Sequence, residues 1–170
     1  MLGSRNFWLA MAALVVLYLL PFGVSGYVLG LLTVAYYYAV AAMAWDLLFG
    51  FAGEVNFGPS FLVGLGAYAA ALLNVYAATP ILPCLLAAAA AAVVGGLVLA
   101  VPALRLRGPY FGLVTLVAVL LLQNILVLFS GITGGEIGLP LTDVLAIDDH
   151  TNYWYALGFM TISGGLLFGL

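Results

Sequence analysis

Long apolar runs alternate with short polar interruptions along this chain of 170 residues. An α-helix rises 1.5 Å per residue, so about 20 apolar residues cross a hydrocarbon core of about 30 Å. We therefore predict an all-α fold, a polytopic bundle of about six transmembrane helices. The runs that predict these helices are residues 7–22 (the shortest), 27–45, 61–78, 81–101, 111–129 and 153–170.

The interruption between the second and third predicted helices differs from a plain loop. It reads Gly50-Phe-Ala-Gly-Glu-Val-Asn-Phe-Gly-Pro59, with apolar residues on both sides. A carboxylate at the bilayer centre costs roughly 2.5–3.5 kcal/mol, and non-helical backbone at that depth must be buried or line a water-filled cavity. We predict a broken or re-entrant segment; the alternative is a cytoplasmic turn with a solvated Glu54. The residues predicted to line a substrate path here are Gly50, Gly53, Glu54, Asn56 and Gly58.

The composition supports a membrane protein and excludes several other classes. The chain is 67% hydrophobic and 5% charged, whereas an ordinary soluble domain is roughly 25% charged. It contains no lysine, so it cannot form a P-loop, and any ATP must be bound by a partner chain. It has no basic patch, so we expect no nucleic-acid partner.

The few basic residues predict the orientation. Cytoplasmic loops are enriched in Lys and Arg. If Arg5 is cytoplasmic, four crossings return Arg105 and Arg107 to the same side, and the acidic loop 131–151 falls outside. We therefore predict a cytoplasmic N-terminus and a cytoplasmic turn at Arg105 and Arg107.

The remaining polar residues give weaker predictions. Gln123 and Asn124 lie in the middle of the fifth predicted helix, where their amides either bond a neighbouring helix or contact substrate. Asp46 follows Trp45 and is interpreted as an interfacial residue. Residues 148–150 (Asp-Asp-His) are interpreted as a solvated loop rather than a metal site. No nucleophile–base–orienter set is evident, so we expect no catalytic residue, no metal, no cofactor and no enzymatic activity.

Two further observations concern helix packing and a polar residue within a helix. In the fourth predicted helix, small residues recur four apart, as in Ala91 with Gly95 and Ala92 with Gly96. Such spacing is typical of closely packed membrane helices, but also of generic alanine-rich ones. Thr115 is expected to bond its own helix backbone.

Three stretches together resemble the permeases of branched-chain amino acid ABC transporters. The first stretch resembles the family's glycine-rich signature and reads Leu47-Leu-Phe-Gly-Phe-Ala-Gly-Glu-Val-Asn-Phe-Gly-Pro-Ser-Phe-Leu-Val-Gly-Leu-Gly-Ala-Tyr68. The second stretch resembles the family's basic turn and reads Arg105-Leu-Arg-Gly-Pro-Tyr-Phe111. The third resembles its Thr-Gly-Gly loop and reads Thr133-Gly-Gly-Glu-Ile-Gly-Leu139. The Arg-Leu-Arg-Gly turn is similar to that of the second permease subunit type.

The resemblance implies a binding-protein-dependent importer in the inner (plasma) membrane. Its partners would be a second permease subunit, two cytoplasmic ATPase subunits, a periplasmic or extracellular solute-binding protein and membrane lipid. Residues 1–170 would form a single permease domain, expected to be truncated at the C-terminus because the last apolar run has no polar flank. The alternatives are an ABC permease for urea or short amides, an ion-coupled secondary transporter with Glu54 as its proton or ion site, and a non-transporting membrane scaffold.

Overall fold

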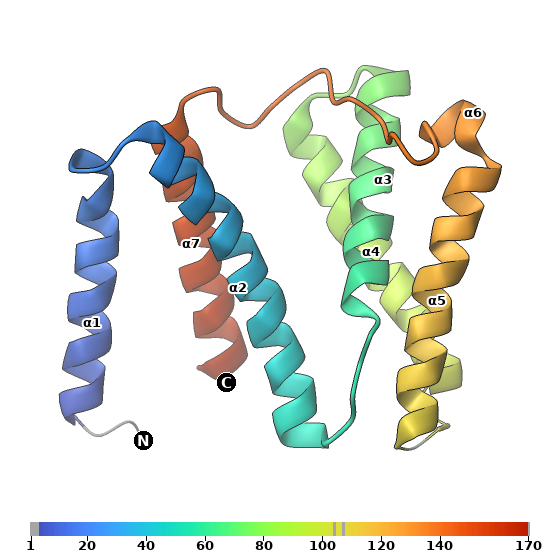
Figure 1. Cartoon of the computed structure of the whole chain (residues 1–170), viewed down its shortest axis with the longest axis horizontal. Helices are drawn as coiled ribbons and strands as arrows, with labels where there is room; N and C mark the ends of the chain where they lie inside the picture. The colour runs from blue at the N-terminus through green and yellow to red at the C-terminus, as the bar shows by residue number, and fades with distance from the viewer. Residues whose placement is uncertain (1–3, 104, 107, 170) are drawn as a thin grey trace. The chain divides into compact units, whose positions relative to one another are not determined.

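A computed structural model describes residues 4–103, 105–106 and 108–169, and their regular structure is helical throughout. No strand occurs within these ranges, so the predicted all-α class is confirmed. Figure 1 shows the elements in chain order. They are α1 (Ser4–Leu19), the 3-10 helix η1 (Leu20–Phe22), α2 (Gly26–Ala52), α3 (Pro59–Ala77), α4 (Ile81–Ala103), α5 (Pro109–Leu128), the short α6 (Ser130–Thr133) and α7 (Asp149–Phe168).

Four of the described helices are long and apolar enough to cross a membrane. They are the stretch Gly26–Phe51 of α2, together with α3, α4 and α5. Two of the six predicted spans do not meet these criteria. The apolar part of the first, Met11–Phe22, is shorter, and α7 has 20 residues but begins with the polar turn Asp149-His-Thr-Asn152.

The boundary of α2 corrects one sequence prediction. The helix was expected to end at residue 45, but it continues to Ala52 and includes Gly50. It ends at Gly53, whose φ of +68° lies in the left-handed region that glycine adopts without a steric penalty. The break is therefore Gly53–Gly58, and Gly50 lies in the helix that precedes it.

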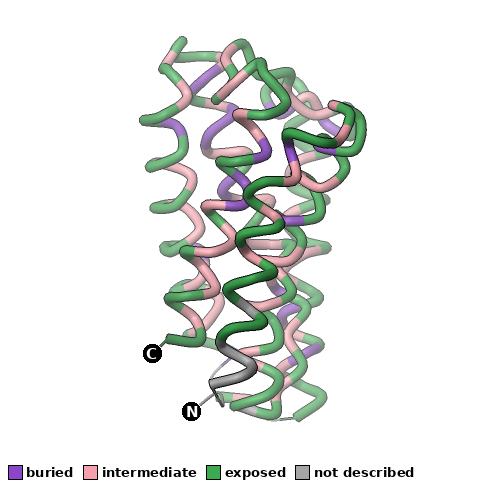
Figure 2. Tube along the Cα trace, turned by 90° about the vertical axis from the view of Figure 1, so that its left-hand side faces the viewer, coloured by how far each residue is buried: buried purple, intermediate pink, exposed green. Residues whose placement is uncertain are grey.

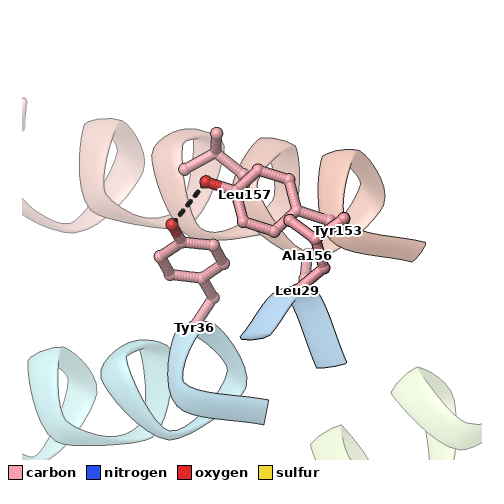
Figure 3. Packing of buried hydrophobic residues seen from close by; sticks show 5 residues of the cluster. All are labelled: Leu29, Tyr36, Tyr153, Ala156 and Leu157. Carbon is pink, nitrogen blue, oxygen red and sulfur yellow. Dashed lines mark hydrogen bonds between the residues drawn. The ribbon is translucent and has the colours of Figure 1, made fainter. Parts of the chain in front are cut away.

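The chain forms two compact units, one of residues up to 44 and from 146 onward, the other of residues 45–145. The core of the first unit lies where α2 meets α7 (Figure 3). The Tyr36 and Tyr153 rings meet edge to face at 5.3 Å, and their hydroxyls share a hydrogen bond of 2.8 Å. Tyr153 is fully buried, and its hydroxyl also donates to the Leu17 carbonyl of α1 (2.7 Å), which links three helices.

The second unit is built on the α3–α4 hairpin, whose helices cross at close range (Figure 1). A Cβ added to Gly66 would lie 3.1 Å from the Ala88 carbonyl oxygen, and one added to Gly95 would overlap the Leu65 side chain. These contacts favour the closely packed interpretation of the small residues in α4.

Large apolar side chains remain exposed along most of the described chain. In Figure 2 the buried segments are few and the trace is mostly exposed or intermediate. Leu86 and Leu128, on two membrane-length helices, are 75% and 76% exposed. Exposed apolar surface on this scale marks contact with lipid or other protein chains.

Candidate functional site in the unwound segment

The unwound segment between α2 and α3 is defined by a glycine, an asparagine turn and a proline. Gly53 ends α2, and Pro59 occupies the first turn of α3, where its missing N–H leaves no helical bond unmade. Between them, the Asn56 side-chain oxygen accepts a hydrogen bond from the Gly58 amide at 2.7 Å. This turn is one that asparagine stabilises through its own side chain.

The segment follows the first two turns of α5. The Glu54 Oε1 atom accepts a hydrogen bond from the Gly108 amide (3.3 Å), and the Phe57 amide donates to the Thr115 hydroxyl (3.0 Å). Between these points, a Cβ at Gly112 would lie only 3.2 Å from the Val55 carbonyl oxygen. At 1.5 Å per residue, the interval from 108 to 115 corresponds to about 10 Å along the helix.

Two residues outside the predicted substrate path hold this arrangement. Thr115 does bond its own helix, by donating to the Gly112 carbonyl (2.9 Å), but the same hydroxyl accepts from Phe57. The indole N–H of Trp45, the residue before Asp46, donates to the Asn56 carbonyl at 2.6 Å. Its ring stacks on that of Phe49, 5.4 Å away. In the sequence, the only indication of this role is a threonine about one helical turn after a glycine, and no pattern identifies Phe57 as the partner of Thr115.

A cavity of about 490 Å³ lies between this segment and the start of α5. Glu54 contributes a carboxylate, and Val55, Phe57 and Leu113 contribute apolar walls. The Glu54 Oε2 atom is buried and has no hydrogen-bond partner among the described residues. A buried carboxylate oxygen of this kind can accept a hydrogen bond from a solute or hold a cation.

The other predicted path residues lie away from this cavity. Gln123 is 15 residues beyond Gly108 in sequence, about 22 Å along α5, and lines a separate cavity. The Asn124 amide donates to the Leu120 carbonyl of its own helix at 2.7 Å. Asn124 therefore pairs neither with a neighbouring described helix nor with the unwound segment.

Apart from Glu54, the charged residues singled out in the sequence are exposed where they are described. Asp46 lies on the exposed side of α2, and Arg105 is exposed in the turn that precedes α5. Arg107 lies outside the described residues. Asp148 is part of a helix cap, since its side chain accepts hydrogen bonds from the Thr151 amide and hydroxyl at 3.0 Å.

Residues 27–169 match the family described as the permease component of the branched-chain amino acid transport system. This match covers most of the sequence, including the unwound segment and, apart from Gly26, all four membrane-length helices. The chain belongs to this permease family. The resemblance predicted from the three sequence stretches is thereby confirmed.

Two curated members of the permease family are similar to the chain. Both carry the name high-affinity branched-chain amino acid transport system permease protein LivM. The protein from Salmonella typhimurium is 34% identical over 134 residues, which are 76% of this chain and 30% of that protein. The protein from Escherichia coli K12 is 35% identical over 124 residues, 70% of this chain and 28% of that protein. No solved structure matches the chain.

The family and the helices together make this a multi-pass membrane protein of a transport permease class. The chain spans less than a third of the length of the curated relatives that it matches.

Proposed function

We propose that this chain is part of a permease subunit that translocates branched-chain amino acids in a binding-protein-dependent ABC importer. The observation that carries the proposal is the non-helical segment Gly53–Gly58 between two membrane-length helices, with a buried Glu54 oxygen at its cavity that has no partner among the described residues. Unwound backbone between transmembrane helices presents polar groups to a solute, and it is tolerated at depth where it lines a cavity. Membership in the permease family supports this assignment.

The proposed topology has six crossings of the inner membrane in one permease domain, with α1 and α7 as the first and last. Arg5, Arg105 and Arg107 lie on the cytoplasmic side in this topology, following the positive-inside rule. The loop between α6 and α7 then faces outward, and the unwound segment enters the membrane from the cytoplasmic side.

The proposed importer includes a second permease subunit, two cytoplasmic ATPases and an external solute-binding protein. In this proposal ATP hydrolysis by the partner ATPases drives alternating access, and these 170 residues contain no P-loop lysine of their own. Glu54, Asn56 and Gly58 shape the inner part of the path, and Gln123 lies toward its other end.

The test is leucine uptake by the assembled importer in proteoliposomes. Uptake should require ATP and both ATPases, and Glu54→Gln should lower its rate by roughly tenfold or more, as expected for the loss of a charged hydrogen-bond acceptor. As a control, Asp46→Asn removes an exposed carboxylate from α2, the helix that precedes the unwound segment, and should change uptake little. Uptake that survives removal of the ATPases but stops when the proton gradient is dissipated would contradict the proposal. Unchanged uptake in Glu54→Gln would show that the unwound segment does not form part of the substrate path.

A further inference from the structure

A second cavity, of about 400 Å³, lies at the opposite end of α5 from the unwound segment. The residues that line it are Tyr68, Gln123, Leu126, Val127, Gly135 and Glu136. Its volume falls within the range of small-molecule sites, roughly 300–1,000 Å³. It combines three polar side chains with two aliphatic ones, which distinguishes it from a purely apolar packing gap.

A loop fastened by several hydrogen bonds forms the polar side of this cavity. The Thr133 hydroxyl donates to the Leu126 and Phe129 carbonyls and accepts from the Gly135 amide (3.1 Å). From α3, the Tyr68 hydroxyl donates to the Gly135 carbonyl at 3.4 Å. The Tyr76 hydroxyl donates to the Ile132 carbonyl at 2.9 Å. Glu136 therefore projects from a loop fixed at both α3 and α5, and such preorganisation favours ligand binding.

The cavity contains polar side chains whose acceptor atoms are unused within the described part of the chain. Neither Gln123 nor Glu136 makes a hydrogen bond or ion pair within the described part of the chain. The Tyr68 oxygen, which donates to Gly135, keeps its lone pairs as an acceptor. A carboxylate, an amide carbonyl and a phenol oxygen thus provide three acceptors around one space.

Three acceptors including one carboxylate complement a primary ammonium group, which has three donors and one positive charge. Leu126 and Val127 provide an aliphatic wall beside them. Arg105, the one arginine in the described part of this unit, precedes the far end of α5 and does not neutralise Glu136. We propose that this cavity recognises the primary ammonium group of a small aliphatic solute, with Glu136 as its ion partner.

The inference rests on the proposed function, because the solute of the importer would be an aliphatic amino acid that carries such a group. In that context the cavity is a recognition site separate from the unwound segment. The order of contact along the path would place ammonium recognition before passage beside Glu54.

The test uses the assembled importer in nanodiscs, without the solute-binding protein, and isopentylamine as the probe. Saturation-transfer NMR should show saturable binding that leucine displaces and that 4-methylpentanoate, which lacks the ammonium group, does not. Glu136→Gln should weaken the apparent affinity by about tenfold or more, and Glu136→Asp by less. Asp149→Asn, which removes another exposed carboxylate, should leave binding unchanged.

Equal binding by the wild type and Glu136→Gln, or displacement by 4-methylpentanoate as effective as by leucine, would overturn the inference. If Glu136→Gln does not assemble, Gln123→Leu provides the second variant and should also weaken isopentylamine binding. ATP-driven leucine uptake is measured on the same preparation. If leucine uptake is normal but isopentylamine binding does not depend on Glu136, only this site is contradicted. If uptake is absent, the proposed function is contradicted, and the binding measurement can still be interpreted by itself.

Discussion

Thr115 ties the unwound segment to α5 through a single hydroxyl group. Its exposed fraction is 1%; its bond to the Gly112 carbonyl is buried, and its bond from the Phe57 amide is part-buried. One bond was expected from the sequence, because a helical threonine commonly donates to its own backbone. The other, from the Phe57 amide, depends on how a distant segment packs and has no local signal.

Thr115→Val keeps the shape of the side chain but removes the acceptor for the Phe57 amide. An unsatisfied buried N–H costs roughly 1–3 kcal/mol, and this bond is part-buried, so we expect a loss of about 1 kcal/mol in the free energy of unfolding. Chemical unfolding in mixed micelles measures it. Thr115→Ser retains the hydroxyl and should lose less; equal stability of the valine variant and the wild type would show that the bond is dispensable.

Asp148 stabilises the start of α7 in a pH-dependent way. Hydrogen bonds from the Thr151 amide and hydroxyl lower the pKa of the Asp148 carboxyl below its usual value of 3.8. A lowered folded-state pKa means that the stabilisation is present above about pH 3.8 and is lost as the pH falls through the folded-state pKa. The stability difference between the wild type and Asp148→Ala should therefore shrink in this acid range. A difference that stays constant from pH 6 to pH 2.5 would contradict the cap.

At the level of elements, the apolar runs predict most helices because length and hydropathy are local properties. The ends of α3, α4 and α5 lie within two residues of their predicted positions. The end of α2 was missed by seven residues, since Gly50 is tolerated inside a helix whose end is set by Gly53. The short α6 was missed too, because four residues carry no periodic pattern.

The Thr133-Gly-Gly loop offers an element-scale prediction. Gly134 has a φ of +73°, and a Cβ there would overlap the Gly138 backbone. Gly134→Ala should destabilise the loop by roughly 1–3 kcal/mol from backbone strain alone, and amide hydrogen exchange at Gly135 should accelerate accordingly. Gly131→Ala meets nothing within 4 Å and is the matched control. Similar exchange in the two variants would contradict the observed loop conformation.

At the scale of the whole molecule, the unwound segment shows which features the sequence predicts and which appear only in the folded structure. The sequence predicts that residues 50–59 are unusual, because glycines, a proline and a carboxylate interrupt apolar helices. It cannot predict that Glu54 meets Gly108 or that Trp45 holds Asn56, since these contacts form only when the helices pack. The sequence therefore predicts where the helices are interrupted, whereas the cavity and the contacts that support the segment are seen only in the structure.

The central claim is that the unwound segment lines an aqueous path across the membrane. Val55, which lines the cavity beside Glu54, tests it directly as Val55→Cys in a Cys84→Ala background of the assembled importer. A charged methanethiosulfonate reagent should modify this variant and block leucine uptake, whereas Val94→Cys on an exposed stretch of α4 should stay unmodified in lipid. A Val55→Cys importer that transports normally and is no more reactive than Val94→Cys would contradict the claim.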